Sequence, residues 1–294
     1  MNEPTPLPRL RPLCGCTRRH FGVFAGALLA GGAAEASVPE CKRSRAASLV
    51  PAGQLENSAQ SQYAQLLGQA RGKGALVAAG DVQVQRLRYI AARIIPFAPE
   101  CNERARQWRW EVNLLASNQL NAFCMPGGKI AFFSGILARL QLSDDEVAMI
   151  MGHEVAHALL EHARERMAKS GGTQLLLRGG AALLGLGNLG DLAAQGASQL
   201  LSLRFSRDDE SEADALGLVM SARAGYDPRA GVSLWQKMGQ ASGADGKGAP
   251  PQWLSTHPAG ATRIKDIEAR LPALLPVFER AGRPDRRFAP PAKS

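Results

Sequence analysis

The stretch His153-Glu154-Val155-Ala156-His157 decides how this chain is read. Successive residues of an α-helix are about 100° apart around its axis, so positions i and i+4 lie roughly 40° apart on one face. Two imidazoles at that spacing can reach one metal ion, and Glu154 lies near enough to hold a water molecule beside it. Because so short a pattern also arises by chance on amphipathic helices, its surroundings must decide.

The surroundings of the stretch predict a helix. Ser143-Asp144-Asp145-Glu146 has the spacing of a capping box, with Ser143 as the N-cap. From there to about Lys169 the chain contains Gly152 but no proline, and it is rich in strong helix formers. The motif therefore falls inside one long helix, where the i, i+4 geometry holds.

A catalytic zinc ion usually has three protein ligands, and two glutamates are candidates for the third. Glu161 follows His157 by four residues on nearly the same face, but one turn further along the axis. Glu210 opens a second predicted helix that runs to about Ala224 and is closed by Gly225. We assign the third ligand to Glu210, because in its E-x-x-x-D arrangement with Asp214 the glutamate can bind zinc while the aspartate orients a ligating histidine.

Three polar residues near these ligands receive other roles. Asp214 shares a helix face with Glu210, so its carboxylate can orient a ligand, which we take to be His153, through the second ring nitrogen. Glu212 lies roughly 200° from Glu210 and is expected to be a surface or packing carboxylate. His162 is turned away from the metal face of the predicted continuous helix and is expected to be solvated or to cap the helix.

Several segments together resemble a known family, the M48 metallopeptidases, and within it the soluble Oma1-like and LoiP- or BepA-like branch. The resemblance covers roughly residues 60–272. It is carried by His153–His157, by residues 206–214 (Ser-Arg-Asp-Asp-Glu-Ser-Glu-Ala-Asp), by Thr256-His257-Pro258 with Arg263, and by residues 121–128 (Asn-Ala-Phe-Cys-Met-Pro-Gly-Gly). The resemblance implies one zinc ion per chain, with His153, His157 and Glu210 as ligands, Glu154 as general base and Asp214 as the partner of a ligand.

The resemblance also places His257 and Arg263 near the open metal position, where either could stabilise an oxyanion. In such enzymes the histidine of this motif can occupy the zinc in a resting, self-inhibited state. From the residues alone, His257-Pro258 begins a short helix that reaches about Arg270, so His257 could equally be a helix cap.

The expected reaction is hydrolysis of a peptide bond by a zinc-activated water, with Glu154 moving the proton and no covalent intermediate. An extended substrate would add as a strand to an exposed sheet edge. Residues 129–133 (Lys-Ile-Ala-Phe-Phe) are the candidate edge, although β-branched and aromatic residues suit a core strand as well.

The N-terminus is typical of an export signal. Residues 17–21 (Thr-Arg-Arg-His-Phe) resemble a twin-arginine motif, residues 22–34 are apolar, and Ala34-Glu35-Ala36 offers a cleavage site. We therefore expect a periplasmic protein cut near Ala36. The alternative is a membrane anchor, for which the apolar run is shorter than the roughly 20 residues a span needs.

Cysteine and charge patterns add two expectations. Cys41, Cys101 and Cys124 follow the signal, and Cys101 with Cys124 is the first candidate for a disulfide. The net charge is +9, of which +2 lies in the first 36 residues, but Lys and Arg are scattered. This pattern favours a solvated basic surface, with peripheral contact to a membrane or envelope assembly machinery as the alternative, over nucleic-acid binding.

The chain divides into a signal, a flexible leader, a peptidase domain and a Pro/Arg-rich tail. Helices are expected at residues 60–70, 82–95 and 134–140, and strands at 108–116, 119–124 and 129–133. Gly-rich residues 171–190 are a candidate lid, and residues 242–251 a turn-rich linker. The expected boundaries are 1–36, 37–55, 56–272 and 273–294. The predicted fold is α+β and zincin-like, mostly helical, with a small sheet beside the metal helix.

The sequence is compatible with two functions. The first is an exported zinc endopeptidase that acts on misfolded or misassembled envelope proteins. The second is a non-proteolytic chaperone-like or binding module that retains a zinc site. The presence of Glu154 favours the first, because a purely structural site needs no base.

Overall fold

The computed structural model describes residues 41–169, 200, 203–243, 253, 256–257 and 262–292. The predicted signal at 1–36, the candidate lid at 171–190 and residues 244–251 of the predicted linker lie outside this range. None of the described helices is both long enough and apolar enough to cross a membrane.

Two long helices precede the sheet. The first helix, α1 (Ala52–Gly72), follows a short 3-10 helix, Arg45–Leu49. The second, α2 (Val82–Ile94), begins at an Asp81 cap and carries a fully buried row of apolar side chains. The predicted flexible leader is therefore wrong for residues 41–55. Val50 and Leu55 are fully buried in a cluster with Met167, and this burial holds the segment in place.

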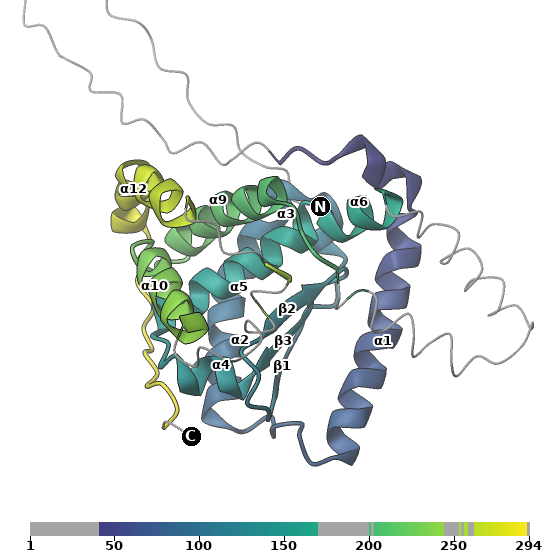
Figure 1. Ribbon diagram of the computed structural model, residues 1–294, viewed down its shortest axis with the longest axis horizontal. Coiled ribbons are helices and arrows are strands. Elements are labelled where there is room, and N and C mark those ends of the chain that lie inside the picture. Colours follow the sequence, from purple (N-terminus) through teal and green to yellow (C-terminus); the bar gives the residue numbers. More distant parts are fainter. Residues whose placement is uncertain are drawn as a thin grey trace, which may run out of the picture. The chain divides into compact units, whose positions relative to one another are not determined.

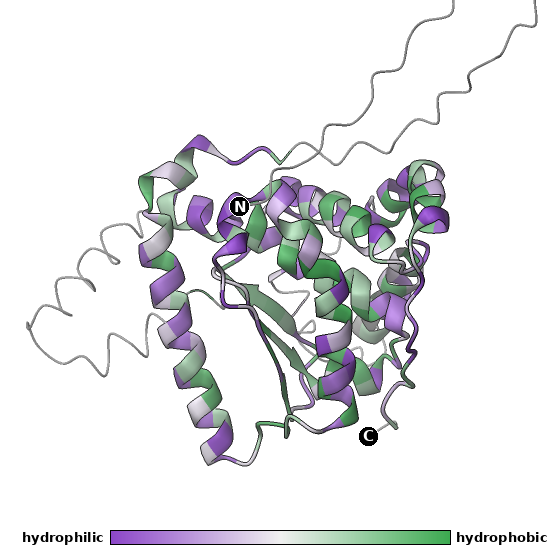
Figure 2. Ribbon diagram, turned by 180° about the vertical axis from the view of Figure 1, so that it is seen from behind, coloured by the Kyte–Doolittle hydropathy of each residue, from purple (hydrophilic) through white to green (hydrophobic). Residues whose placement is uncertain are grey.

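Three strands form a small mixed sheet: β1 (Glu111–Leu115), β2 (Ala122–Met125) and β3 (Lys129–Phe133), in the order β1-β3-β2. Strand β3 pairs parallel with β1 and antiparallel with β2. The prediction that residues 129–133 form an exposed edge is wrong. β3 is central, and the residues Ile130, Ala131 and Phe132 are fully buried. Seen from behind, the strands are mostly hydrophobic (Figure 2).

The metal-motif helix is shorter than predicted. Helix α5 (Asp144–Leu159) starts with the predicted capping box between Ser143 and Glu146. It ends at Leu159 with Leu160 as the C-cap, and α6 (His162–Lys169) begins after Glu161. Glu161 between them has a positive φ of 60°, and its buried carboxylate pairs with Arg164. The single helix expected to Lys169 is therefore wrong, because tertiary contacts break it where the local sequence gives no breaker.

Helix α9 (Arg207–Arg223) lies against α5, which in turn lies between α9 and the sheet (Figure 1). Glycines on both helices allow the close approach. A Cβ at Gly152 would lie 2.6 Å from the carbonyl oxygen of Gly217, and one at Gly217 would lie 2.6 Å from the backbone nitrogen of His153. Gly225 ends the helix region with a φ of 85°, as predicted for a glycine after the C-cap. The glycine pair brings the carboxylates of α9 to the histidines of α5.

Among the described residues, the remaining α-helices are α3 (Ala98–Cys101), α4 (Ser134–Arg139), α10 (Ala230–Gly243) and α12 (Arg263–Arg280). Two 3-10 helices, Ile95–Phe97 and Glu103–Arg106, flank α3. Helix α12 continues through Pro272 and Pro276 to Arg280. The predicted tail from residue 273 therefore begins as part of this helix. Residues after Arg280 are also held, since the backbone N–H of Phe288 donates to Asp144 at 2.8 Å and Arg287 pairs with Asp145 at 2.9 Å. The predicted boundary between residues 272 and 273 therefore falls inside a helix.

The disulfide joins Cys41 to Cys101, with the two Cα atoms 5.4 Å apart. The expected pair Cys101–Cys124 is wrong, because the N-terminal segment, not β2, comes beside the end of α3. Cys124 is a free thiol on β2. The α+β fold, mostly helical with a small sheet beside the metal-motif helix, is as predicted.

Candidate metal centre

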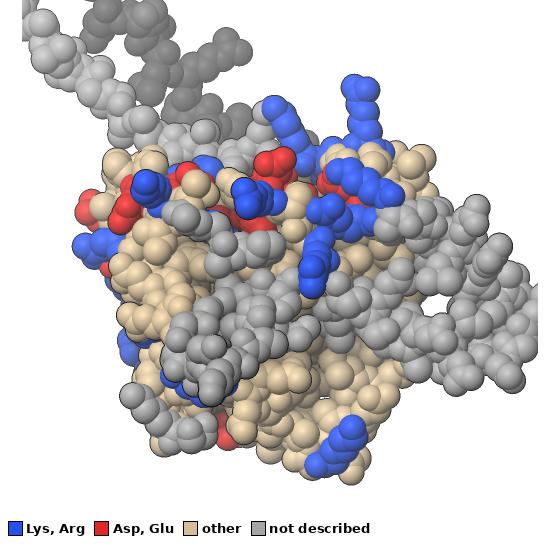
Figure 3. Space-filling view, in the orientation of Figure 1, with Lys and Arg blue, Asp and Glu red and all other residues tan. Residues whose placement is uncertain are grey.

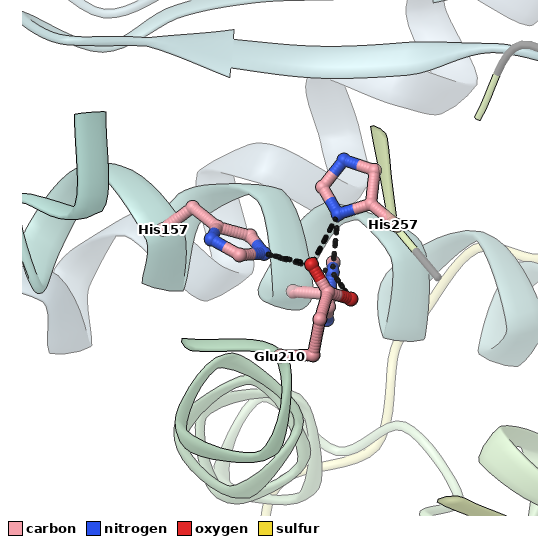
Figure 4. Close-up of side chains that lie close together, drawn as sticks. His157, Glu210 and His257 are labelled. Carbon is pink, nitrogen blue, oxygen red and sulfur yellow. Dashed lines mark hydrogen bonds and ion pairs between the residues drawn. The ribbon is translucent and has the colours of Figure 1, made fainter. Parts of the chain in front are cut away.

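Four buried side chains from three parts of the chain converge on one point. They are His153 and His157 on α5, Glu210 on α9, and His257 from the segment before α12. Figure 4 shows His157, Glu210 and His257 pointing toward one another. Each offers one ligand atom, and these atoms all lie within 4.8 Å of one another. No more than 3% of any of the four residues is exposed.

The three predicted ligands are brought together as their spacing requires. The Nε2 atoms of His153 and His157 are 3.1 Å apart. The carboxylate of Glu210 approaches both, with Oε1 3.4 Å from His157 Nε2 and Oε2 3.5 Å from His153 Nε2. Glu161, the other candidate, turns its carboxylate to Arg164 instead. Two imidazole nitrogens and one carboxylate oxygen, shielded from bulk water, form a donor set that fits zinc.

Asp214 and Arg263 lie behind these ligands. Asp214 Oδ1 is 2.9 Å from His153 Nδ1, the contact predicted for a residue that orients a ligand. Arg263 donates to both oxygens of Asp214, at 2.6 and 2.8 Å, and to Glu210 Oε2 at 2.5 Å. The Arg263 guanidinium also lies 3.8 Å from the centre of the Trp235 ring. The structure therefore places Arg263 beside the cluster, paired with the two buried carboxylates. A role for Arg263 in stabilising an oxyanion stays a prediction.

The electrostatics of this cluster follow from its ion pairs. Burial acts to raise the pKa of Glu210, but the hydrogen bonds and charges of His157, His257 and His153 reverse it, so its pKa is strongly lowered. Burial likewise opposes ionisation of Asp214, but the charge of Arg263 and the contact with His153 lower its pKa. Both carboxylates are therefore held ionised, which a cation site needs. Burial also lowers the pKa of His157, which keeps its ring neutral.

His257 occupies the fourth side of the cluster. Its Nδ1 lies 2.9 Å from Glu210 Oε1 and 3.2 Å from His153 Nε2. Its backbone N–H donates to the Trp253 carbonyl at 2.8 Å, and the two rings stack with centroids 5.0 Å apart. Burial disfavours the charged ring of His257, but Glu154 and Glu210 outweigh burial and raise its pKa. The ring is thus close enough to the ligands to serve as a fourth ligand itself.

Glu154 points into the same space from α5. Its Oε1 accepts a hydrogen bond of 2.6 Å from the indole N–H of Trp253 and lies 3.5 Å from His257 Nε2. The side chain is 3% exposed. Sequence reasoning missed Trp253, although its position four residues before His257 was a usable signal. The indole holds the carboxylate beside the cluster without neutralising it.

His162 is the clearest departure from the sequence-based expectation. Its ring is buried, with Nδ1 2.9 Å from His157 Nδ1 and Nε2 3.4 Å from a carboxylate oxygen of Glu212. The predicted solvated or capping role is wrong, because the break at Glu161 turns His162 back toward His157. Glu212, expected to be a surface or packing carboxylate, is at the surface with 54% of its side chain exposed.

A cleft runs between the cluster and the outer side of β2. Its lining includes Glu154, His157 and His257 together with Phe123, Met125 and Phe205. β2 pairs with β3 on one side only, and among the described strands none pairs with its other side. The edge beside the cluster is therefore β2, in place of the predicted β3.

Comparisons with known proteins agree with this geometry. A model of the family described as peptidase family M48 matches residues 84–271, more than half of the chain. Mitochondrial metalloendopeptidase OMA1 of Arabidopsis thaliana is 40% identical over 156 residues, which are 53% of this chain and 30% of that protein. The Schizosaccharomyces pombe protein of the same name is 37% identical over 168 residues, 56% of this chain and 47% of that protein.

A bacterial relative matches as well. The putative beta-barrel assembly-enhancing protease of Vibrio cholerae is 30% identical over 165 residues, 53% of this chain and 34% of that protein. The match to this chain thus spans less than half the length of each of these three relatives. Both branches of the predicted resemblance, Oma1-like and BepA-like, are confirmed.

Proposed function

The chain belongs to peptidase family M48, and from that premise we propose that it is a zinc-dependent endopeptidase that acts on misfolded or misassembled proteins of the bacterial envelope. One observation carries the proposal. Three buried ligand atoms of His153, His157 and Glu210 converge, and the carboxylate of Glu154 lies beside them. A purely structural zinc site would gain nothing from a buried, ionisable carboxylate that is not needed as a ligand.

Each residue of the cluster has a defined task in this proposal. Zinc held by His153, His157 and Glu210 would lower the pKa of water and polarise the scissile carbonyl. Glu154 accepts the proton of the attacking water and returns it to the leaving amine. Trp253 fixes the Glu154 carboxylate in place. Asp214 accepts from His153 Nδ1 and so leaves Nε2 free to act as a ligand.

The substrate class follows from the cleft. An extended chain that adds to the free side of β2 would pass along the cluster, with main-chain hydrogen bonds supplying most of the affinity. Because such bonds do not depend on side-chain identity, an unfolded protein with little sequence preference is the expected substrate. The apolar lining from Phe123, Met125 and Phe205 supports the same class.

Export to the periplasm is part of the proposal. The twin-arginine-like start and the cleavage site at Ala36 support it, and so does the Cys41–Cys101 disulfide, since disulfides persist mainly in oxidising compartments. The similarity to beta-barrel assembly-enhancing proteases supports contact with envelope assembly machinery as the partner class. Retention by an uncleaved N-terminal anchor is the alternative address.

Metal removal provides the test of this function. The purified chain starting at Ser37 should degrade casein with one equivalent of zinc, lose that activity after dialysis against a chelator, and regain it with added zinc. Magnesium should not restore it, because imidazole ligands favour zinc over magnesium. Zinc binding with no cleavage of casein under any condition would favour the non-proteolytic binding module.

His257 provides a second prediction. Four protein ligands would close the site, whereas a catalytic zinc keeps one position open. We expect His257→Ala to raise casein hydrolysis, by roughly tenfold if one molecule in ten is open in the unaltered protein. Initial rates at equal zinc occupancy measure this effect. A fall in kcat at unchanged zinc occupancy would instead assign His257 to the transition state.

A further inference from the structure

His162 lies on the side of His157 that faces away from the cluster. The positive φ of Glu161 ends the helical path after α5, and α6 begins with His162. As a result the two rings meet through their Nδ1 atoms at 2.9 Å. His162 Nε2 faces a carboxylate oxygen of Glu212 at 3.4 Å. Glu212, His162 and His157 therefore form a series of hydrogen-bonding groups that leads from the surface to the cluster.

Only one arrangement of protons on His162 and His157 leaves His157 able to bind a metal. His157 presents Nε2 to Glu210 and His153, so that atom must carry a lone pair and the proton must be on Nδ1. His157 Nδ1–H then donates to His162 Nδ1, which must accept. His162 consequently carries its own proton on Nε2, where it can donate to Glu212. A carboxylate at this end therefore favours the tautomer that the metal needs.

The surroundings leave the His157 ring little freedom. Phe205 stacks on it with centroids 4.1 Å apart and planes inclined by 28°. His162 is 2% exposed, so bulk water does not compete for the Nδ1 contact. His153 is held in the corresponding way, by Asp214 at 2.9 Å. Each of the two histidines thus has a hydrogen-bond acceptor on its Nδ1, a carboxylate in one case and an imidazole backed by a carboxylate in the other.

We propose that His162 is a positioning residue that fixes the tautomer and orientation of His157 for metal binding, and that Glu212 acts through it. This inference rests on the proposed function, because it takes His157 to be a zinc ligand. Glu212 lies on α9 and its side chain is 54% exposed. Figure 3 shows acidic and basic side chains together along the upper edge of the molecule. Solvent screening makes its contribution smaller than that of buried His162.

Zinc affinity, measured by competition with a chromogenic chelator, tests the proposal. His162→Phe keeps an aromatic ring but removes the acceptor, and it should weaken zinc binding by about 10- to 100-fold. His162→Asn keeps an acceptor near the position of Nδ1 and should bind zinc within about threefold of the unaltered chain. Glu212→Ala should weaken binding by several-fold when His162 is present, and should change nothing in the His162→Asn background.

Controls separate positioning from a structural role. Asp208→Ala removes the same charge from an exposed site one turn earlier on α9 and should leave zinc affinity unchanged. Denaturant unfolding of the metal-free proteins reports stability separately. The proposal is overturned if His162→Phe and His162→Asn bind zinc equally well, or if Glu212→Ala weakens binding equally in both backgrounds. If His162→Phe does not fold, the Glu212 cycle in the His162→Asn background decides. An unaltered chain that takes up no zinc overturns the proposed function and this inference together.

Discussion

Glu154→Gln is expected to lower casein hydrolysis by about 10²- to 10⁴-fold and to leave zinc bound. Glutamine has the same shape, and its amide oxygen can still accept the hydrogen bond that Trp253 donates at 2.6 Å. An amide cannot take a proton from water at neutral pH, so the general base alone is lost. Because Glu154 lies outside the set of four ligand atoms, the metal site should remain intact. The measurements are initial rates and the zinc content of the purified variant.

An exposed glutamate supplies the matched control. Glu268→Gln on α12 makes the same chemical change at an exposed residue and should leave the rate unchanged. Hydrolysis that persists in Glu154→Gln at the unaltered rate would mean that another group, or a contaminating protease, performs the reaction. Loss of zinc together with activity would show that Glu154 supports the metal site itself.

Local geometry explains which parts of the site the sequence could predict. The pairs His153/His157 and Glu210/Asp214 each lie four residues apart on one helix, and helical periodicity places such pairs together in any fold. The start of α5 was predictable for the same reason, since a capping box acts within one turn. These predictions needed only the choice of helix.

Long-range packing explains the failures. Residues 160–162 (Leu-Glu-His) contain no glycine or proline, so the helix break that turns His162 toward His157 depends on burial of Glu161 and its pair with Arg164. The strands were found from their composition, but nothing local specifies that β3 lies between β1 and β2. The disulfide was misassigned for a similar reason. Cys41 reaches Cys101 only because the N-terminal segment packs into the core.

The contact between Gly152 and Gly217 could be predicted only in part. A glycine inside a predicted helix signals close approach of another backbone, and both glycines are visible in the sequence. The sequence does not show, however, which helix packs against which. The structure shows that they face each other, which places Glu210 and Asp214 within reach of His153.

Arg263→Met is expected to destabilise the metal-free protein by about 3–5 kcal/mol, because breaking a buried ion pair leaves uncompensated charge in the interior. Arg263 is 6% exposed and pairs with Glu210 and Asp214, and both carboxylates have lowered pKa values in the folded protein. Methionine retains much of the volume against Trp235 but supplies no charge. Zinc should restore part of the lost stability, since the dication replaces positive charge beside Glu210.

The pH dependence of this loss has a definite sign. A carboxylate whose pKa is lower in the folded than in the unfolded protein stabilises the folded state at any pH above its unfolded pKa of about 4. This stabilisation is lost as the pH falls from there through the pKa of the folded protein. Without Arg263, burial favours the protonated forms of Glu210 and Asp214. The free energy of unfolding of the variant therefore approaches that of the unaltered protein as the two carboxylates take up protons. The difference in unfolding free energy should therefore be largest near pH 7 and narrow toward about pH 4. An unchanged stability with loss of kcat alone would instead place Arg263 on the substrate, as the sequence had suggested.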